Sequence, residues 1–112
     1  MVNLGLIGAG RWGRNYIRTV ERLPGVRLAA VASRNPETQT RVGPSVQVVR
    51  EWKSILNFGL DGLILAVPPT VQPEIALRAI EAGLPLLLEK PMALDPVLAR
   101  EIVSQAQAQD VY

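Results

Sequence analysis

The sequence contains no cysteine and no histidine, and each absence excludes a class of site. Without cysteine the chain forms no disulfide and no thiolate metal site, and without histidine it holds no zinc cluster of the common kind and no Ser-His-Asp triad. Most hydrolase chemistry is therefore excluded from these residues. Aromatic residues are also scarce, at 4%, whereas 48% of the chain is hydrophobic. Such an aliphatic composition is typical of parallel sheets that are buried on both faces.

The sequence also lacks any block of like charge. Its 12 basic and 10 acidic residues give a net charge of +2 and are spread along the chain, which argues against a surface dedicated to nucleic acid. The sequence does not begin with a basic leader followed by an apolar core, and no apolar stretch is long enough to span a membrane. We therefore expect a cytoplasmic protein whose partners include neither nucleic acid nor a membrane.

The most informative stretch that is present is GLIGAGRWG, residues 5–13, where an apolar run ends in the pattern G-x-G-x-x-G. We expect Gly8 to permit a tight turn, Gly10 to let the backbone approach a pyrophosphate, and Gly13 to allow close packing of helix and strand. The phosphates would lie at the helix N-terminus, where N–H groups and the helix dipole favour an anion. A glycine-rich turn without a ligand is the alternative.

Two residues inside this motif, Arg11 and Trp12, are further candidates for contact with a dinucleotide. Trp12 would shield the phosphates. An aromatic residue at this place more often belongs to the core, however, because it begins a set of apolar residues at helical spacing. The set consists of Trp12, Tyr16, Ile17, Val20 and Leu23.

Short apolar runs alternate with helical patterns along the whole chain. The sequence predicts strands at 4–7, 26–32, 46–49, 63–67 and 84–88. It predicts helices at 12–23, from 36 to about 43, at 51–56, from 70 or 71 to 82, and from 97 to about 109, with a further strand starting at 110–112. This order predicts an α/β fold: one three-layer domain, residues 1–112, with a doubly wound parallel sheet (Rossmann fold) of strand order 3-2-1-4-5.

Local signals define the ends of two of these helices. Asn35 and Asp95 are each followed by proline, which predicts an N-cap and then the first helical residue. The last helix is expected to bury one line of apolar residues, namely Leu98, Ile102, Val103 and Ala106.

Four marked segments directly follow predicted strands: residues 8–13, 33–34, 67–72 and 89–91. Ligands of such sheets bind beyond the carboxyl ends of the strands, where the strand order reverses, so we expect the four segments to meet at one edge.

In the third segment, Val67, Pro68, Pro69 and Thr70 are candidates for contact with a cofactor. The two prolines would form a wall beside the ligand, or only end the strand, because proline donates no hydrogen bond to the ladder. Thr70 would cap the next helix, whether or not its hydroxyl also faces the ligand.

Taken together, the motifs resemble the N-terminal nucleotide-binding domain of the glucose-fructose oxidoreductase, inositol dehydrogenase and MocA family (Gfo/Idh/MocA). The resemblance rests on GLIGAGRWG, on VPPTVQPEIALRAIEAG at residues 67–83 and on EKP at residues 89–91, and it covers essentially the whole chain. It implies an oxidoreductase domain that binds a nicotinamide dinucleotide, in an enzyme that transfers a hydride between this cofactor and a hydroxy compound such as a sugar or polyol.

The resemblance also implies roles for single residues. Lys90 is identified as the catalytic lysine near the nicotinamide and the reacting carbon, and Glu89 and Pro91 shape its loop. Gln72, a further candidate for the cofactor site, stands where many members carry histidine, so that an amide replaces a titratable group. The family's C-terminal substrate domain, with its expected proton donor, is absent from these 112 residues.

Two expectations follow from that missing domain. We expect the chain alone to bind cofactor without turnover, and to meet its small-molecule substrate only together with a second domain. We also expect self-association, as a dimer for example, because the fifth strand would leave an open sheet edge and exposed apolar surface.

Cofactor preference depends on the end of the second predicted strand. NAD-dependent members of this fold carry Asp or Glu about twenty residues after the glycine turn. Ser33 occupies this place, and the adjacent Arg34 offers a planar charge suited to a 2′-phosphate. We expect a preference for NADP over NAD, unless Ser33 and Arg34 only begin a solvated loop.

Two other functions remain open from the sequence. One is a stand-alone nucleotide-binding or sensing module without turnover. The other is a domain for a different phosphorylated ligand, such as a CoA-type nucleotide.

Overall fold

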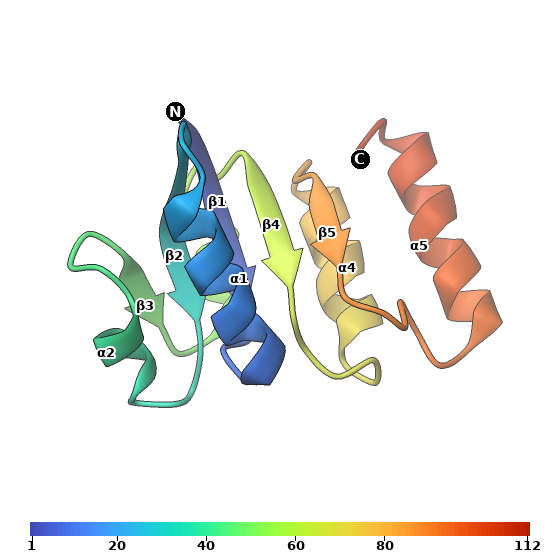
Figure 1. Ribbon diagram of the computed structural model, residues 1–112. Helices are drawn as coiled ribbons and strands as arrows, with labels where there is room; N and C mark the ends of the chain where they lie inside the picture. Colours follow the sequence, from blue (N-terminus) through green and yellow to red (C-terminus); the bar gives the residue numbers. More distant parts are fainter.

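A five-stranded parallel sheet forms the centre of the molecule. The computed structural model describes all of residues 1–112. The strands lie in the order β3-β2-β1-β4-β5, as the sequence predicts (Figure 1). Their bounds are Val2–Ile7 for β1, Val26–Ala32 for β2, Gln47–Val49 for β3, Gly62–Leu65 for β4 and Leu86–Leu88 for β5.

The central strand, β1, pairs with β2 on one side and with β4 on the other. Its last residue, Ile7, lies opposite Ala32 in the first pairing and opposite Leu65 in the second. The three strands therefore end at the same level, and the loops that follow them leave from one edge of the sheet. The strand order reverses between β1 and β4, which is where sheets of this kind bind their ligands.

Five helices connect and follow the strands. They are α1 at Arg11–Arg22, α2 at Thr38–Arg41, α3 at Trp52–Ile55, α4 at Gln72–Glu81 and α5 at Pro96–Ala108. In Figure 1, α1 crosses in front of the sheet, α4 lies behind β5, and α5 stands beyond the β5 edge. No helix of the chain has both the length and the apolar character needed to cross a membrane.

Alternate residues of the strands face opposite sides of the sheet and pack into two separate apolar clusters. The first cluster covers the α1 side, and its central members are Leu6, Ile17, Val20, Val31 and Ile64. The second covers the side of α3, α4 and α5, and its central members are Ile7, Ala32, Ile55, Leu65, Ile80 and Ile102. Helices cover both faces of the sheet, so the domain has three layers. This is why the strand sequences are continuous apolar runs.

Several element ends differ from the prediction by a few residues, and three of these differences have a clear local reason. The β4 strand ends at Leu65 instead of 67, although the Ala66 amide still donates to the Ile7 carbonyl at 2.9 Å. β5 begins at Leu86 instead of 84, because the Leu84 amide donates to the Ala79 carbonyl and so belongs to the turn that ends α4. The N-cap predicted at Asn35 is wrong: Asn35 accepts a hydrogen bond from the Glu37 amide in a turn, and α2 begins only at Thr38.

Helix α5 begins as predicted but buries fewer residues than predicted. Asp95 is its N-cap, and the carboxylate accepts a 2.8 Å hydrogen bond from the Val97 amide. Ile102 is buried, whereas Leu98 and Val103 are 38% and 44% exposed. α5 lies beyond the edge strand and packs against α4, so the rest of its apolar face has no second element to cover it.

The strand expected at 110–112 is not formed. The chain nevertheless lies against β5 there, since the Leu86 amide donates to the Tyr112 carbonyl at 2.7 Å.

Candidate functional site

The three glycines of the turn after β1 differ in what surrounds them. Gly8 has a φ of +98°, and a Cβ on it would lie 2.3 Å from the Ala66 carbonyl oxygen, so a side chain is excluded both by conformation and by space. A Cβ on Gly13 would lie 2.1 Å from the Gly8 carbonyl oxygen, which shows how closely α1 packs on the turn. No atom lies within 4 Å of a Cβ built on Gly10. Packing within the chain therefore explains Gly8 and Gly13 but not Gly10.

Helix α1 begins directly after this open position. Gly10 is its N-cap, and no side chain caps the first N–H groups of the helix. Arg11 and Trp12 are exposed in the first turn, and Trp12 is 60% exposed. The interpretation of Trp12 as a core residue is therefore wrong, because the core side of α1 begins at Gly13 and continues with Ile17 and Val20.

A cavity of about 320 Å³ opens at the carboxyl edge of the sheet. Apolar side chains from strand ends and from the start of α4 line one part of it, and polar residues that follow β2 and β3 line the rest. The lining residues are Ile7, Ala32, Ser33, Arg34, Arg50, Glu51, Trp52, Val67, Val71 and Ile75. An apolar pocket with a few polar groups at this place is the common form of a nucleotide site.

The predicted site residues Ser33, Arg34 and Val67 are thus brought together at one cavity. Arg50 and Trp52, which follow the three-residue strand β3, were not predicted from the sequence. The apolar pattern of a three-residue strand is too short to indicate from the sequence that the residues after it lie at the site. The glycine turn, Glu89 and Lys90 do not line this cavity.

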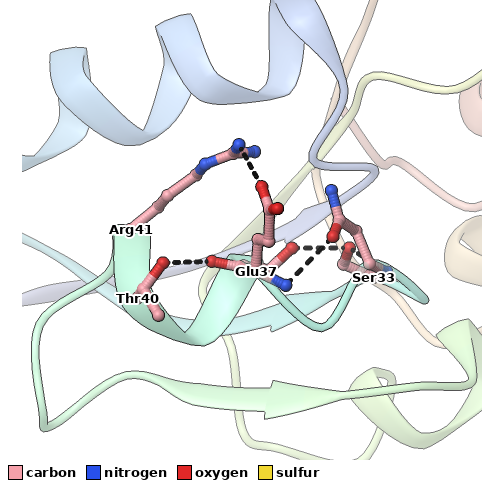
Figure 2. Close-up of polar contacts among 6 residues, drawn as sticks. Ser33, Glu37, Thr40 and Arg41 are labelled. Atoms are coloured by element: carbon pink, nitrogen blue, oxygen red, sulfur yellow. Dashed lines mark hydrogen bonds and ion pairs between the residues drawn. The ribbon is translucent and has the colours of Figure 1, made fainter.

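Both residues of the predicted cofactor-preference pair already have partners within the chain. The Ser33 hydroxyl lies 2.8 Å from the Thr38 hydroxyl and accepts a 3.1 Å hydrogen bond from the Asn35 amide (Figure 2). Arg34 donates from Nη2 to both carboxylate oxygens of Glu51, at 3.2 and 3.1 Å. The side chains of Arg34 and Glu51 are 70% and 57% exposed, so this ion pair is solvated.

The segment after β4 forms a turn before α4. The Pro68 carbonyl accepts hydrogen bonds from the amides of Val71 and Gln72, both at 3.1 Å. Pro68 is exposed and Pro69 is half-buried. Thr70 is exposed and caps nothing: the N-cap of α4 is Val71, and no side chain hydrogen-bonds to the helix start. The predicted capping role of Thr70 is therefore wrong.

Gln72 is completely buried at the start of α4. Its Nε2 donates toward the carbonyl oxygens of Glu89, Pro91 and Met92 at 2.7, 3.3 and 3.2 Å. A buried polar side chain that meets three carbonyls of one loop fixes the path of that loop. The amide of Gln72 thus holds the segment that carries Lys90. Its Oε1 is buried without a hydrogen-bond partner.

Tyr16 holds the same segment from the opposite face of the sheet. The phenol of Tyr16, on α1, donates a 2.7 Å hydrogen bond to the Glu89 carboxylate. This hydrogen bond, followed by burial and the charge of Glu89, raises the pKa of Tyr16 above its ordinary value of 10.0. This role of Tyr16 was not predictable from the sequence, because a tyrosine at helical spacing is typical of the core. Lys90 follows Glu89 directly and is exposed at the same edge of the sheet.

Comparison with known proteins agrees with this geometry. The family model for Gfo/Idh/MocA, described as an oxidoreductase family with an NAD-binding Rossmann fold, matches residues 2–112. The rhizopine catabolism protein MocA of Rhizobium meliloti is 29% identical over 97% of this chain and 35% of its own length. Inositol 2-dehydrogenase 1 of Paenarthrobacter aurescens is 28% identical over 96% of this chain and 33% of its own length.

A crystal structure from Magnetospirillum magnetotacticum, of a protein assigned as an oxidoreductase, superposes with a TM-score of 0.92 at 42% identity. The superposition covers 98% of this chain and 36% of that one. The chain thus spans about a third of the length of the relatives it matches. Its fold, its glycine turn and these matches place it in the Gfo/Idh/MocA oxidoreductase family, as the NAD-binding Rossmann domain.

Proposed function

We propose that the carboxyl edge of the sheet binds NADP in preference to NAD, and that this domain presents the cofactor to a sugar, a polyol or a related hydroxy compound held by a second domain. The observation that carries the proposal is the open space at Gly10, at the uncapped start of α1 and three residues after Ile7, which lines the 320 Å³ cavity. A pyrophosphate at Gly10 would meet the first N–H groups of α1 and the positive end of its dipole.

The residues present fit the rest of a dinucleotide. Ile7, Val67 and Val71 offer an apolar surface for the adenine ring, and Ser33 and Arg34 stand at the polar side of the same cavity. From the pyrophosphate, the other half of the cofactor would extend along the ends of β4 and β5 toward Lys90. A bound nicotinamide supplies hydride transfer, which no side chain of this chain performs.

Lys90 is the proposed catalytic residue. Its ammonium group is exposed at the end of β5, while its backbone belongs to the segment held by Gln72 and Tyr16. A fixed cation beside the reacting hydroxyl stabilises negative charge that develops on the oxygen, chiefly in the transition state. In an enzyme that includes the substrate domain, Lys90→Met should lower turnover by about a hundredfold or more and leave cofactor affinity nearly unchanged. Wild-type turnover in this variant would contradict the assignment.

The preference for NADP rests on the absence of an acidic residue directly after β2. Ser33 and Arg34 repel no phosphate there, and Arg34 is held only by a solvated ion pair, so its guanidinium can exchange Glu51 for a phosphate. A charge-assisted contact of about 1.5 to 3 kcal/mol corresponds to roughly ten- to a hundredfold preference for NADP.

Calorimetric titration with NADPH and NADH tests this proposal directly. Arg34→Ala and Ser33→Asp should each weaken NADPH binding, and Ser33→Asp should strengthen NADH binding. Equal affinities in the parent chain, or unchanged NADPH binding in both variants, would contradict the preference. A CoA-type nucleotide in the same titration should not bind, and tight binding of CoA without binding of NADPH or NADH would contradict the proposed function itself.

The β5 edge of the sheet supports the proposal of a partner domain and of self-association. Leu87 on the edge strand and Val103 on α5 are 52% and 44% exposed, and β5 has a neighbouring strand on one side only. Open edges and exposed apolar side chains favour association. Analytical ultracentrifugation should show oligomers at high concentration, and a single monomeric species at that concentration would contradict self-association. A cytoplasmic location, without nucleic-acid or membrane partners, completes the proposal.

A further inference from the structure

We propose that a groove between α1 and α2 binds a phosphate group. The groove is a cavity of about 300 Å³ lined by Arg14, Ile17, Arg18 and Arg41. Three of these four residues are arginines, and none is acidic. The proposal does not depend on the proposed dehydrogenase function, because it concerns the α1 side of the sheet and residues that were assigned no role above.

The arginines come from two elements that the fold places side by side. Arg14 and Arg18 lie four residues apart on α1 and therefore share one face of the helix, on either side of the buried Ile17. Arg41 is the last residue of α2, and Figure 2 shows its side chain extending away from α2 toward the blue ribbon of α1. More than twenty residues separate Arg41 from the two arginines of α1, so the grouping of all three exists only in the fold.

One guanidinium in the groove has unused hydrogen-bonding capacity. Arg41 donates from Nη2 to the Glu37 carboxylate at 2.9 Å, and its side chain is only 27% exposed. Its other terminal nitrogen, Nη1, is buried and has no hydrogen-bond partner. Buried N–H donors are nearly always paired in proteins, and an unpaired donor on a charged group is more costly still.

The charges in the groove are also unbalanced. Glu37 is the one carboxylate bonded to these arginines, and it pairs with Arg41 alone, whereas three guanidinium groups line the groove. Arg18 itself donates to the side-chain oxygen of Asn15, which is neutral. A phosphate dianion would accept from Arg41 Nη1 and would offset the repulsion between the cations. Guanidinium groups suit this ligand because their planar N–H pairs match two phosphate oxygens at once.

The phosphate could come from two sources of the same chemistry. It could be the 2′-phosphate of NADP, since α2 follows the loop that contains Ser33, in which case this groove and not Arg34 would hold that phosphate. It could also belong to a separate phosphorylated molecule. Both sources require the same three arginines.

Titration of the chain with inorganic phosphate, observed by phosphorus NMR and by thermal unfolding at constant ionic strength, tests the site. Phosphate should bind and raise the unfolding temperature more than chloride does. Arg41→Gln and Arg18→Gln should each weaken binding at least tenfold. Arg27→Gln, a matched loss of one exposed arginine that does not line the groove, should leave binding unchanged. Arg18→Gln keeps the test valid if Arg41→Gln fails to fold, because Arg18 is exposed.

A phosphate effect equal to that of chloride, or equal in all three variants, would overturn the proposal. Repeating the titration with saturating NADPH or NADH separates the two sources. Displacement of phosphate by NADPH alone identifies the cofactor's 2′-phosphate as the ligand, and retention with both dinucleotides identifies a separate phosphorylated ligand. If neither dinucleotide binds, the proposed cofactor function fails while the phosphate result stands.

Discussion

Tyr16 and Glu89 are 73 residues apart in the sequence, yet the phenol of the first donates a 2.7 Å hydrogen bond to the carboxylate of the second. The contact joins the helix that follows the glycine turn to the residue that precedes Lys90. It also determines how Tyr16 ionises, because a tyrosinate facing the Glu89 carboxylate would lose the hydrogen bond and add a like charge.

Replacing Tyr16 with phenylalanine should destabilise the domain by about 1 kcal/mol at neutral pH, through loss of this hydrogen bond. The raised pKa adds a pH dependence of known sign. The stability it confers is fully present below pH 10.0 and is lost as the pH rises toward the higher value in the folded state. Urea denaturation at pH 7, 9 and 10.5 should therefore show a steeper loss of stability in the parent chain than in Tyr16→Phe.

The matched control for this series is Tyr112→Phe. The side chain of Tyr112 is 92% exposed, and its contact with β5 is made by the backbone carbonyl, which the substitution keeps. Tyr112→Phe should behave as the parent chain does at pH 7. An equal decline above pH 10 in the parent and in Tyr16→Phe would contradict the coupling of Tyr16 to Glu89.

Gln72→Leu should lower the free energy of unfolding by about 2 to 4 kcal/mol, because three loop carbonyls lose their shared donor in a buried place. Gln105→Leu makes the same chemical change at an exposed position of α5 and should alter stability by less than about 0.5 kcal/mol. Chemical denaturation of the two variants measures the difference. Equal stabilities would show that the Gln72 amide does not hold the loop.

Gly10→Ala should separate folding from binding. A Cβ at Gly10 meets nothing, and its φ of −74° suits alanine, so thermal unfolding should be nearly unchanged. The added methyl group would nevertheless occupy the space through which a pyrophosphate approaches the backbone, and affinity for NADPH and NADH should fall at least tenfold. Gly43→Ala, where a Cβ also meets nothing, is the control and should change neither property. Full dinucleotide affinity in Gly10→Ala would place the pyrophosphate elsewhere.

Gly13→Ala should behave in the opposite way. Its Cβ would lie 2.1 Å from the Gly8 carbonyl oxygen, and backbone on both sides leaves no flexible group to yield. We expect a loss of stability of about 1 to 3 kcal/mol, measured by the same thermal and chemical unfolding. A stable Gly13→Ala variant would mean that α1 can move away from the turn.

Glu51→Gln should increase the affinity for NADPH, because it releases the Arg34 guanidinium from its ion pair. An exposed ion pair contributes up to about 1 kcal/mol, so the gain should be at most about fivefold, with no change for NADH. Glu101→Gln removes an equal charge from an exposed position on α5 and should leave both affinities unchanged. A gain for NADH equal to that for NADPH would show that Arg34 does not distinguish the two cofactors.

The fold was largely predictable because its determinants are local. Continuous apolar runs such as 26–32 identify buried parallel strands. The segments between these runs have the length of the helical crossovers that connect parallel strands. The strand order then follows from general rules of connection. The exposure of Leu98 and Val103 was not predictable in this way, since a helical pattern shows which face is apolar but not whether another element covers it.

The site was predictable where a residue must follow a strand, as Ser33 and Val67 do. It was not predictable where side chains act across the sheet. Tyr16 fits the apolar stripe of α1, and Gln72 was predicted as a cofactor-site candidate in place of a histidine. Only the path of the chain after β5 gives each of them its hydrogen-bond partner. The three arginines of the groove between α1 and α2 were hidden for the same reason, because spread-out charges in a sequence carry no information on their grouping.

The two residues that hold the Lys90 segment, Tyr16 and Gln72, belong to helices on opposite faces of the sheet, and both precede it in the chain. The lysine is consequently positioned by residues that lie on its N-terminal side. Neither hydrogen bond involves a residue of α5, which follows Met92 in the chain. Changes in the sequence after Met92 can therefore accumulate while the two hydrogen bonds that fix the path of the Lys90 segment are kept.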